Sequence, residues 1–226
     1  MLNEVQILEM VLWIVSMVFL VAVGILFVKD YRKNKTKYFF WISLYFFLFT
    51  VARALRLIVK FYIGEPAYIL GSTQAPLLTG NAWILESAYT IVSYIGLFFI
   101  YYAMESTVVK KTHYFFSIWV WVVTAISMID FVTRALTAIN VILFLVLVLG
   151  LPLIFLNLAI KSRGSVRKNA LLVFIGILFF ILSVALDIPD GKPIFGALPA
   201  VVLATVPPIC AIVSCIFFRK GFSATV

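Results

Sequence analysis

The amino-acid sequence predicts an all-α integral membrane protein, built as a single bundle of seven transmembrane helices over residues 1–226. Of the 226 residues, 65% are hydrophobic and only 12% are charged, so polar residues are too few to cover a water-soluble globule. The apolar residues form seven runs, most of them long enough to cross a hydrocarbon core of about 30 Å. Most of the basic residues stand between these runs.

The first run covers residues 7–28, and two interpretations of it compete. A cleaved signal peptide has a basic start and a short apolar stretch. This run instead follows acidic Glu4, contains Glu9, is long, and ends at the basic tract 29–37. We therefore expect it to be a retained transmembrane helix.

Six further runs follow at regular intervals. Their expected ranges are 38–63, 81–104, 115–133, 135–160, 169–187 and 194–218. The break between the fourth and fifth runs depends on the polar residues between Asp130 and Arg134. In the last run, Pro199, Pro207 and Pro208 predict a bend or a local break, because proline cannot donate to the helical ladder.

The basic residues set the orientation of the bundle. Thirteen of the 18 fall in loops that share one side if the runs alternate in direction, which places that side in the cytoplasm. They are Lys29, Arg32, Lys33, Lys35, Lys37, Lys110, Lys111, Lys161, Arg163, Arg167, Lys168, Arg219 and Lys220. We expect the N-terminus outside, the C-terminus in the cytoplasm, a place in the plasma membrane, and contact of the basic loops with anionic lipid head groups.

Three cations interrupt the second run. Arg53, Arg56 and Lys60 are spaced three and four residues apart, so they share one face of a helix. At 1.5 Å per residue, Arg56 lies roughly 9 Å below the outer end of its helix, and Glu86 lies roughly 8 Å below the outer end of the next helix. This predicts an Arg56–Glu86 pair. Lys60 is expected to extend to the outer interface.

Arg53 lies one turn deeper, near the middle of the membrane. The same depth count finds no carboxylate at its level, so we expect polar partners such as Tyr89, Tyr94 or Asn140, or a bound anion. Two hypotheses follow: a structural ion-pair network, or a polar pocket that opens outward. The candidate residues for either are Arg53, Arg56, Glu86, Tyr89, Asp130 and Asp187.

The sequence lacks the residues that several classes of catalytic, metal and cofactor sites require. His113 is the single histidine, and it has no ligand-spaced Cys, His or carboxylate, so no metal site is expected. Phosphate-loop, nucleophile-elbow and dinucleotide motifs are missing, so we expect neither an enzyme nor a cofactor. Retinal would need a lysine in the seventh run, which has none within 195–218. The basic residues lie between membrane runs, so they do not indicate nucleic-acid binding.

Three stretches carry a resemblance to a known group. They are FFWISLYFFLFTVAR at 39–53, GLFFIYYAME at 96–105 followed by KKTHY at 110–114, and PLIFLNLAIKSRGSVRK at 152–168. The chain resembles uncharacterised archaeal seven-helix membrane proteins, and it is distantly similar to the seven-helix sensor region of some histidine kinases. The resemblance implies that Arg53 and Glu105 are anchor positions. The sequence up to Val226 contains no kinase or other output domain, so a sensor of this kind is expected to signal through a separate partner.

The predicted function is therefore a receptor-like or sensory membrane protein with an outward-facing polar pocket. A small transporter or channel is the alternative, and a structural subunit of a membrane complex is the third possibility. A conducting path would need polar groups below Arg53, where the sequence places no ionisable residue before Glu105. This pattern favours a closed-ended pocket over a path through the bundle.

Overall fold

A computed structural model describes residues 4–64, 81–109, 112–133, 136–187 and 198–222. Within these ranges the chain is helical, with seven α-helices and one short π-helical segment. The helices are α1 (Glu4–Asn34), α2 (Lys37–Ile58), η1 (Val59–Gly64, the π-helical segment), α3 (Asn81–Thr107), α4 (Phe115–Thr133), α5 (Thr137–Lys161), α6 (Gly164–Asp187) and α7 (Ala200–Phe222). The predicted all-helical class and the number of α-helices are confirmed for the described residues.

Two helices, α1 and α6, extend furthest beyond their apolar runs. α1 continues through the basic tract to Asn34, with Arg32 and Lys33 in its last turn, where cations are favourable for the helix dipole. It ends where Lys35 takes the left-handed conformation, at φ 56°. α6 begins at Gly164, five residues before its predicted start. Both extensions arise because charged residues form helix as readily as apolar ones.

The second and seventh helices differ from the prediction at the opposite end of the bundle. α2 gives way after Ile58 to the π-helical segment η1, which contains Lys60. α7 begins at Ala200, so residues 198–199 of its predicted range are not helical, and the start at 194 lies outside the described residues. α7 also runs unbroken through Pro207 and Pro208, so a local break at these two prolines is wrong, and the predicted bend stays a prediction.

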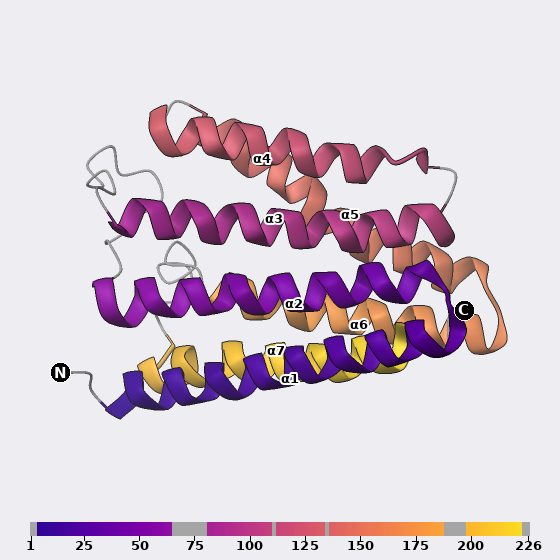
Figure 1. Cartoon of the computed structure of the whole chain (residues 1–226), viewed down its shortest axis with the longest axis horizontal. Coiled ribbons are helices and arrows are strands. Elements are labelled where there is room, and N and C mark those ends of the chain that lie inside the picture. The colour runs from indigo at the N-terminus through magenta and orange to yellow at the C-terminus, as the bar shows by residue number, and fades with distance from the viewer. Residues whose placement is uncertain (1–3, 65–80, 110–111, 134–135, 188–197, 223–226) are drawn as a thin grey trace.

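The seven α-helices form a closed ring. Each packs against the helices before and after it in the sequence, and α1 packs against α7. All run roughly along the long axis of the molecule, with α1 to α4 nearer the viewer and α5 to α7 behind them (Figure 1). The N-terminus and the C-terminus lie at opposite ends, which we call the N-terminal end and the C-terminal end of the bundle.

Six of these helices are long and apolar enough to cross a membrane. They are α1, α2 with the start of η1, α3, α5, α6 and α7. The described apolar part of α4, Phe115–Asp130, is shorter. Many large apolar side chains on the outside of the bundle are exposed, among them Val18, Ile118 and Leu153. The chain therefore has the helices and the apolar outer surface of a multi-pass membrane protein.

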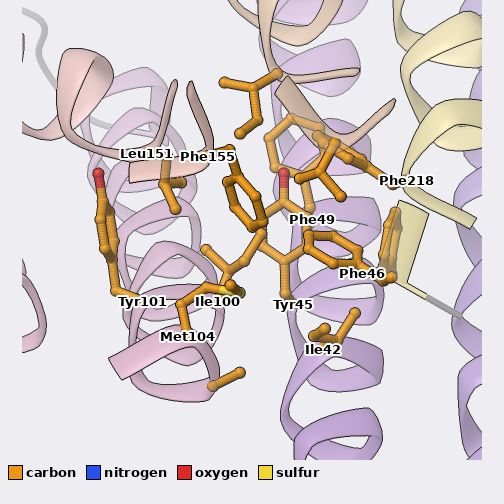
Figure 2. Packing of buried hydrophobic residues seen from close by; sticks show 14 of the residues in the cluster. Ile42, Tyr45, Phe46, Phe49, Ile100, Tyr101, Met104, Leu151, Phe155 and Phe218 are labelled. Carbon is orange, nitrogen blue, oxygen red and sulfur yellow. The ribbon is translucent and has the colours of Figure 1, made fainter. Parts of the chain in front are cut away.

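The interior of the ring is filled mainly by aromatic and aliphatic side chains. Tyr45, Phe46 and Phe49 of α2 lie beside Phe155 of α5 and Phe218 of α7 (Figure 2). The Phe46 and Phe218 rings meet edge to face, with their centroids 6.1 Å apart. Aromatic pairs of this kind add to the stabilisation from burial alone. The middle of the ring is consequently a packed apolar core.

Two polar contacts hold the C-terminal end together. Buried Glu105 of α3 accepts hydrogen bonds from the backbone N–H groups of Phe116 and Ser117 (2.9 and 2.8 Å), and from the Ser117 hydroxyl (2.5 Å). It therefore caps the free N–H groups at the start of α4. Asp30 of α1 pairs with Arg219 of α7, which joins the first helix to the last.

Candidate functional site: a buried charge cluster

The three cations predicted on one face of the second helix are buried toward the N-terminal end of the bundle. Arg53 is 2% exposed and Arg56 is 6% exposed. The side chain of Lys60, in η1, is 9% exposed. A charge removed from water in this way is costly unless it is paired and hydrogen-bonded, so the partners of these cations define the site.

Arg53 pairs with Asp187, the last residue of α6. Its Nη1 lies 2.5 Å from Asp187 Oδ2, and both side chains are almost fully buried. The expectation that Arg53 lacks a carboxylate at its depth is therefore wrong. The depth count compared backbone levels, whereas the long arginine side chain reaches a carboxylate on a helix that is not adjacent to α2 in the ring.

Lys60 joins the same carboxylate from the other side. Its Nζ donates to Asp187 Oδ1 at 3.0 Å and also to Oε1 of Glu9 on α1. Lys60 thus does not extend to an interface, as the sequence suggested, but is held by two acids. Asp187 is shared by two cations, and Lys60 is shared by two carboxylates, so four residues from α1, α2, η1 and α6 form one network. We call Glu9, Arg53, Lys60 and Asp187 the charge cluster.

Aromatic rings line the charge cluster on the side of the apolar core. The guanidinium carbon of Arg53 lies 4.3 Å from the ring centroid of Trp13 on α1 and 5.1 Å from that of Phe49 on α2. Cation–π contacts of this kind are strongest when they are shielded from water. Phe49 is also part of the apolar core, so Arg53 marks the boundary between the core and the charges.

Arg56 points toward α3. Its guanidinium carbon lies 5.9 Å from the ring centroid of Tyr89, so two of the predicted site residues are brought together. Glu86 lies in α3, but its side chain is outside the part of the structure that is described, so the Arg56–Glu86 pair remains a prediction.

Asp130 has a separate role at the turn between α4 and α5. Its Oδ1 accepts a hydrogen bond from the backbone N–H of Leu136 at 3.0 Å, beside the first residue of α5. A short carboxylate in this position satisfies an N–H group that has no partner inside the helix. Of the polar partners suggested for Arg53, Tyr94 and Asn140 bond instead to Ser127 of α4 (3.2 and 2.9 Å).

Two members of the site, Glu9 and Trp13, were not identified from the sequence. A signal for them exists, because the buried residues of α1 recur every three or four positions. They are Glu9, Trp13, Ser16, Leu20, Val23, Gly24 and Phe27. The pattern is hidden because the lipid-facing residues of α1 are as apolar as the buried ones, so no contrast in hydropathy marks the inner face.

The chemistry of the site is charge recognition. The described side chains offer guanidinium and ammonium donors beside carboxylate acceptors and aromatic faces, which suits a polar or charged guest. Within the described ranges, no group of three or more His, Cys, Asp or Glu side chains is arranged to hold a metal ion. Comparisons of the chain with protein-family models, with curated proteins and with solved structures gave no match.

Proposed function

We propose that the chain is a receptor-like membrane protein, and that the charge cluster is its ligand-responsive site. The carrying observation is that Arg53 and Lys60 share one buried carboxylate, Asp187, on a helix that is not their neighbour in the ring. A polar or anionic ligand that competes for either cation loosens the connection between α2 and α6. Binding at one end is thereby converted into a change in helix packing.

The apolar core beneath the cluster supports a receptor over a transporter. Phe46, Phe155 and Phe218 fill the middle of the ring between the charge cluster and the C-terminal end. Among the described buried residues, the next charged side chain toward that end is Glu105, which is already occupied in capping α4. A transported ion would have to cross this core without polar contacts, at a high cost in free energy.

The proposed orientation places the charge cluster on the outside of the plasma membrane. It is supported by exposed basic residues at the C-terminal end, including Lys33, Lys35, Lys161 and Arg167. A strong basic bias is typical of cytoplasmic loops. In this orientation the ligand arrives from outside, and the basic end faces anionic lipid and a separate cytoplasmic signalling partner.

The test combines binding and flux measurements on the purified full chain. Small polar and anionic solutes are screened by thermal shift in nanodiscs, with the wild type beside the Arg53→Lys variant. We expect a saturable rise in Tm that Arg53→Lys reduces. The same solutes are then tested for uptake into proteoliposomes. Solute-specific uptake would replace the receptor by a transporter, and a screen in which no solute shifts Tm would remove the ligand site.

A further inference from the structure

Buried polar atoms without hydrogen bonds are concentrated on the helices around the charge cluster. Among the described residues three such side-chain atoms occur: Ser16 Oγ on α1, Arg53 Nε on α2 and Ser87 Oγ on α3. Buried polar groups in folded proteins are nearly always paired, so unpaired ones call for an explanation. Ser16 and Ser87 each belong to a helix that packs directly against α2, the helix of Arg53.

Ser16 and Arg53 both face the α1–α2 interface, about one helical turn apart along it. Along this antiparallel pair, Glu9 meets Lys60, Trp13 meets Arg53 and Phe27 meets Phe46. Ser16 follows Trp13 by one helical turn, on the same buried face.

The guanidinium of Arg53 lies close to aromatic rings of both helices. It lies over Trp13 of α1 and over Phe49, one turn back along α2, while its Nη1 reaches Asp187 at the N-terminal end. The two unpaired groups therefore both belong to the part of the α1–α2 interface around Trp13.

The chemistry of the pair is that of an acceptor site. Arg53 donates a hydrogen bond from Nη1 to Asp187, whereas its Nε–H has no acceptor among the described residues. The Ser16 hydroxyl, which also has no partner there, can act as a second donor. Two donors require an acceptor. The planar fork of a guanidinium matches a carboxylate in shape, and Trp13 and Phe49 provide flat apolar walls beside it.

We propose that Ser16 and the Nε edge of Arg53 bind the carboxylate of a small organic acid. This inference rests on the proposed receptor function and names the class of its ligand. A singly charged group fits better than a phosphate dianion, because the carboxylates of Glu9 and Asp187 are already in the network and repel added negative charge.

The binding experiment uses sodium acetate and sodium propionate, with sodium chloride at equal ionic strength as the reference. The full chain is held in phosphatidylcholine nanodiscs, whose lipids carry no free carboxylate. We expect both acids to raise Tm saturably above the chloride reference. Ser16→Ala is expected to weaken binding about tenfold, the effect of losing one hydrogen bond to a charged group.

A matched control is available in Ser43. It is equally buried, but its hydroxyl donates to the carbonyl of Phe40 in its own helix at 2.7 Å. Ser43→Ala is expected to leave the apparent Kd within a factor of two. Arg53→Lys keeps a positive charge for Asp187 but lacks the Nε edge, so we expect it to abolish carboxylate binding.

The outcomes separate this inference from the function on which it rests. If acetate and propionate match chloride while another solute shifts Tm in an Arg53-dependent way, the carboxylate site is refuted and the receptor proposal stands. If no solute shifts Tm, both proposals fail. Equal weakening by Ser16→Ala and Ser43→Ala would also overturn the role of Ser16.

Discussion

Arg53 of α2 and Asp187 of α6 form a buried ion pair, 2.5 Å apart, between two helices that are not neighbours in the ring. The negative charge of Asp187 compensates a guanidinium that lies deep within an apolar helix. Asp187 also pairs with Lys60, so the loss of this one carboxylate affects both cations. The stability of the N-terminal end should therefore respond unequally to loss of its two acids.

Asp187→Asn is expected to be strongly destabilising. It leaves Arg53 without its ion-pair partner and removes one of the carboxylates that Lys60 contacts, and breaking a buried pair in this way costs about 3–5 kcal/mol. Thermal unfolding in detergent measures the effect. The exposed acid Glu4, in the first turn of α1, supplies the control, and Glu4→Gln should change stability by less than about 0.5 kcal/mol. Equal Tm values for the two variants would contradict the proposed importance of the pair.

Glu9→Gln is expected to have a smaller effect than Asp187→Asn. Lys60 keeps its 3.0 Å bond to Asp187 when the Glu9 charge is removed, and a glutamine oxygen can still accept from it. The expected loss is about 1–2 kcal/mol, measured by the same unfolding experiment. A loss as large as that of Asp187→Asn would show that Lys60 depends on Glu9 and not on the shared carboxylate.

Coupling between Arg53 and Asp187 is open to a double-mutant cycle. Asp187→Asn leaves the Arg53 charge without its ion-pair partner, and Arg53→Gln leaves Asp187 with one of its two cations. The double variant removes both charges of the pair, so it should be less destabilised than the sum of the single variants. We expect an interaction energy of about 1–3 kcal/mol. Strict additivity would mean that the two side chains do not stabilise each other.

Glu105→Ala is expected to loosen the start of α4. The change removes the acceptor of the Phe116 and Ser117 N–H groups, at an expected cost of about 2–3 kcal/mol. Hydrogen exchange of these two amides should accelerate more than exchange elsewhere in the bundle. Ser106→Ala is a suitable neighbour control, because the Ser106 hydroxyl bonds only to Ala103 of its own helix. Unchanged exchange in Glu105→Ala would argue against the capping role.

Close packing of α6 and α7 predicts a difference between two glycines. A Cβ added to Gly221 would lie 2.5 Å from Val173 Cγ2 and 3.0 Å from the carbonyl oxygen of Asn169. Gly221→Ala should therefore destabilise the bundle by about 1–3 kcal/mol. At Gly96 the nearest atom would be 3.7 Å away, an ordinary contact, so Gly96→Ala should be neutral or slightly stabilising in unfolding measurements.

The sequence predicts the helices of this fold far better than the partners within its site. Apolar runs and basic loops locate all seven α-helices, because membrane length and loop charge act along the chain. The pairing of Arg53 with Asp187 depends on which helices face each other in the ring. Spacing within α2 places Arg53 and Arg56 on one face, but it carries no information about α6.

Trp13 illustrates the same limit in another way. Its cation–π contact with Arg53 needs α1 and α2 to pack at one particular register, which long-range contacts such as Phe27–Phe46 set. In a membrane helix the buried and the lipid-facing sides are both apolar, so the usual sequence signal for an inner face is weak. The polar residues Glu9 and Ser16 on the buried face of α1 are the sequence signal that still indicates which face of this helix points inward.

The ion pairs of α1 also bear on the order in which the chain assembles. At one end Glu9 binds Lys60, and at the other Asp30 binds Arg219, a residue of the last helix. During synthesis from the N-terminus, the Glu9–Lys60 contact becomes possible once α2 and η1 are made, but the Asp30–Arg219 pair can form only after α7 is made. The contacts of α1 are therefore complete only when the last helix packs against it and closes the ring. A chain halted before α7 leaves the Asp30 carboxylate at the C-terminal end without its Arg219 partner.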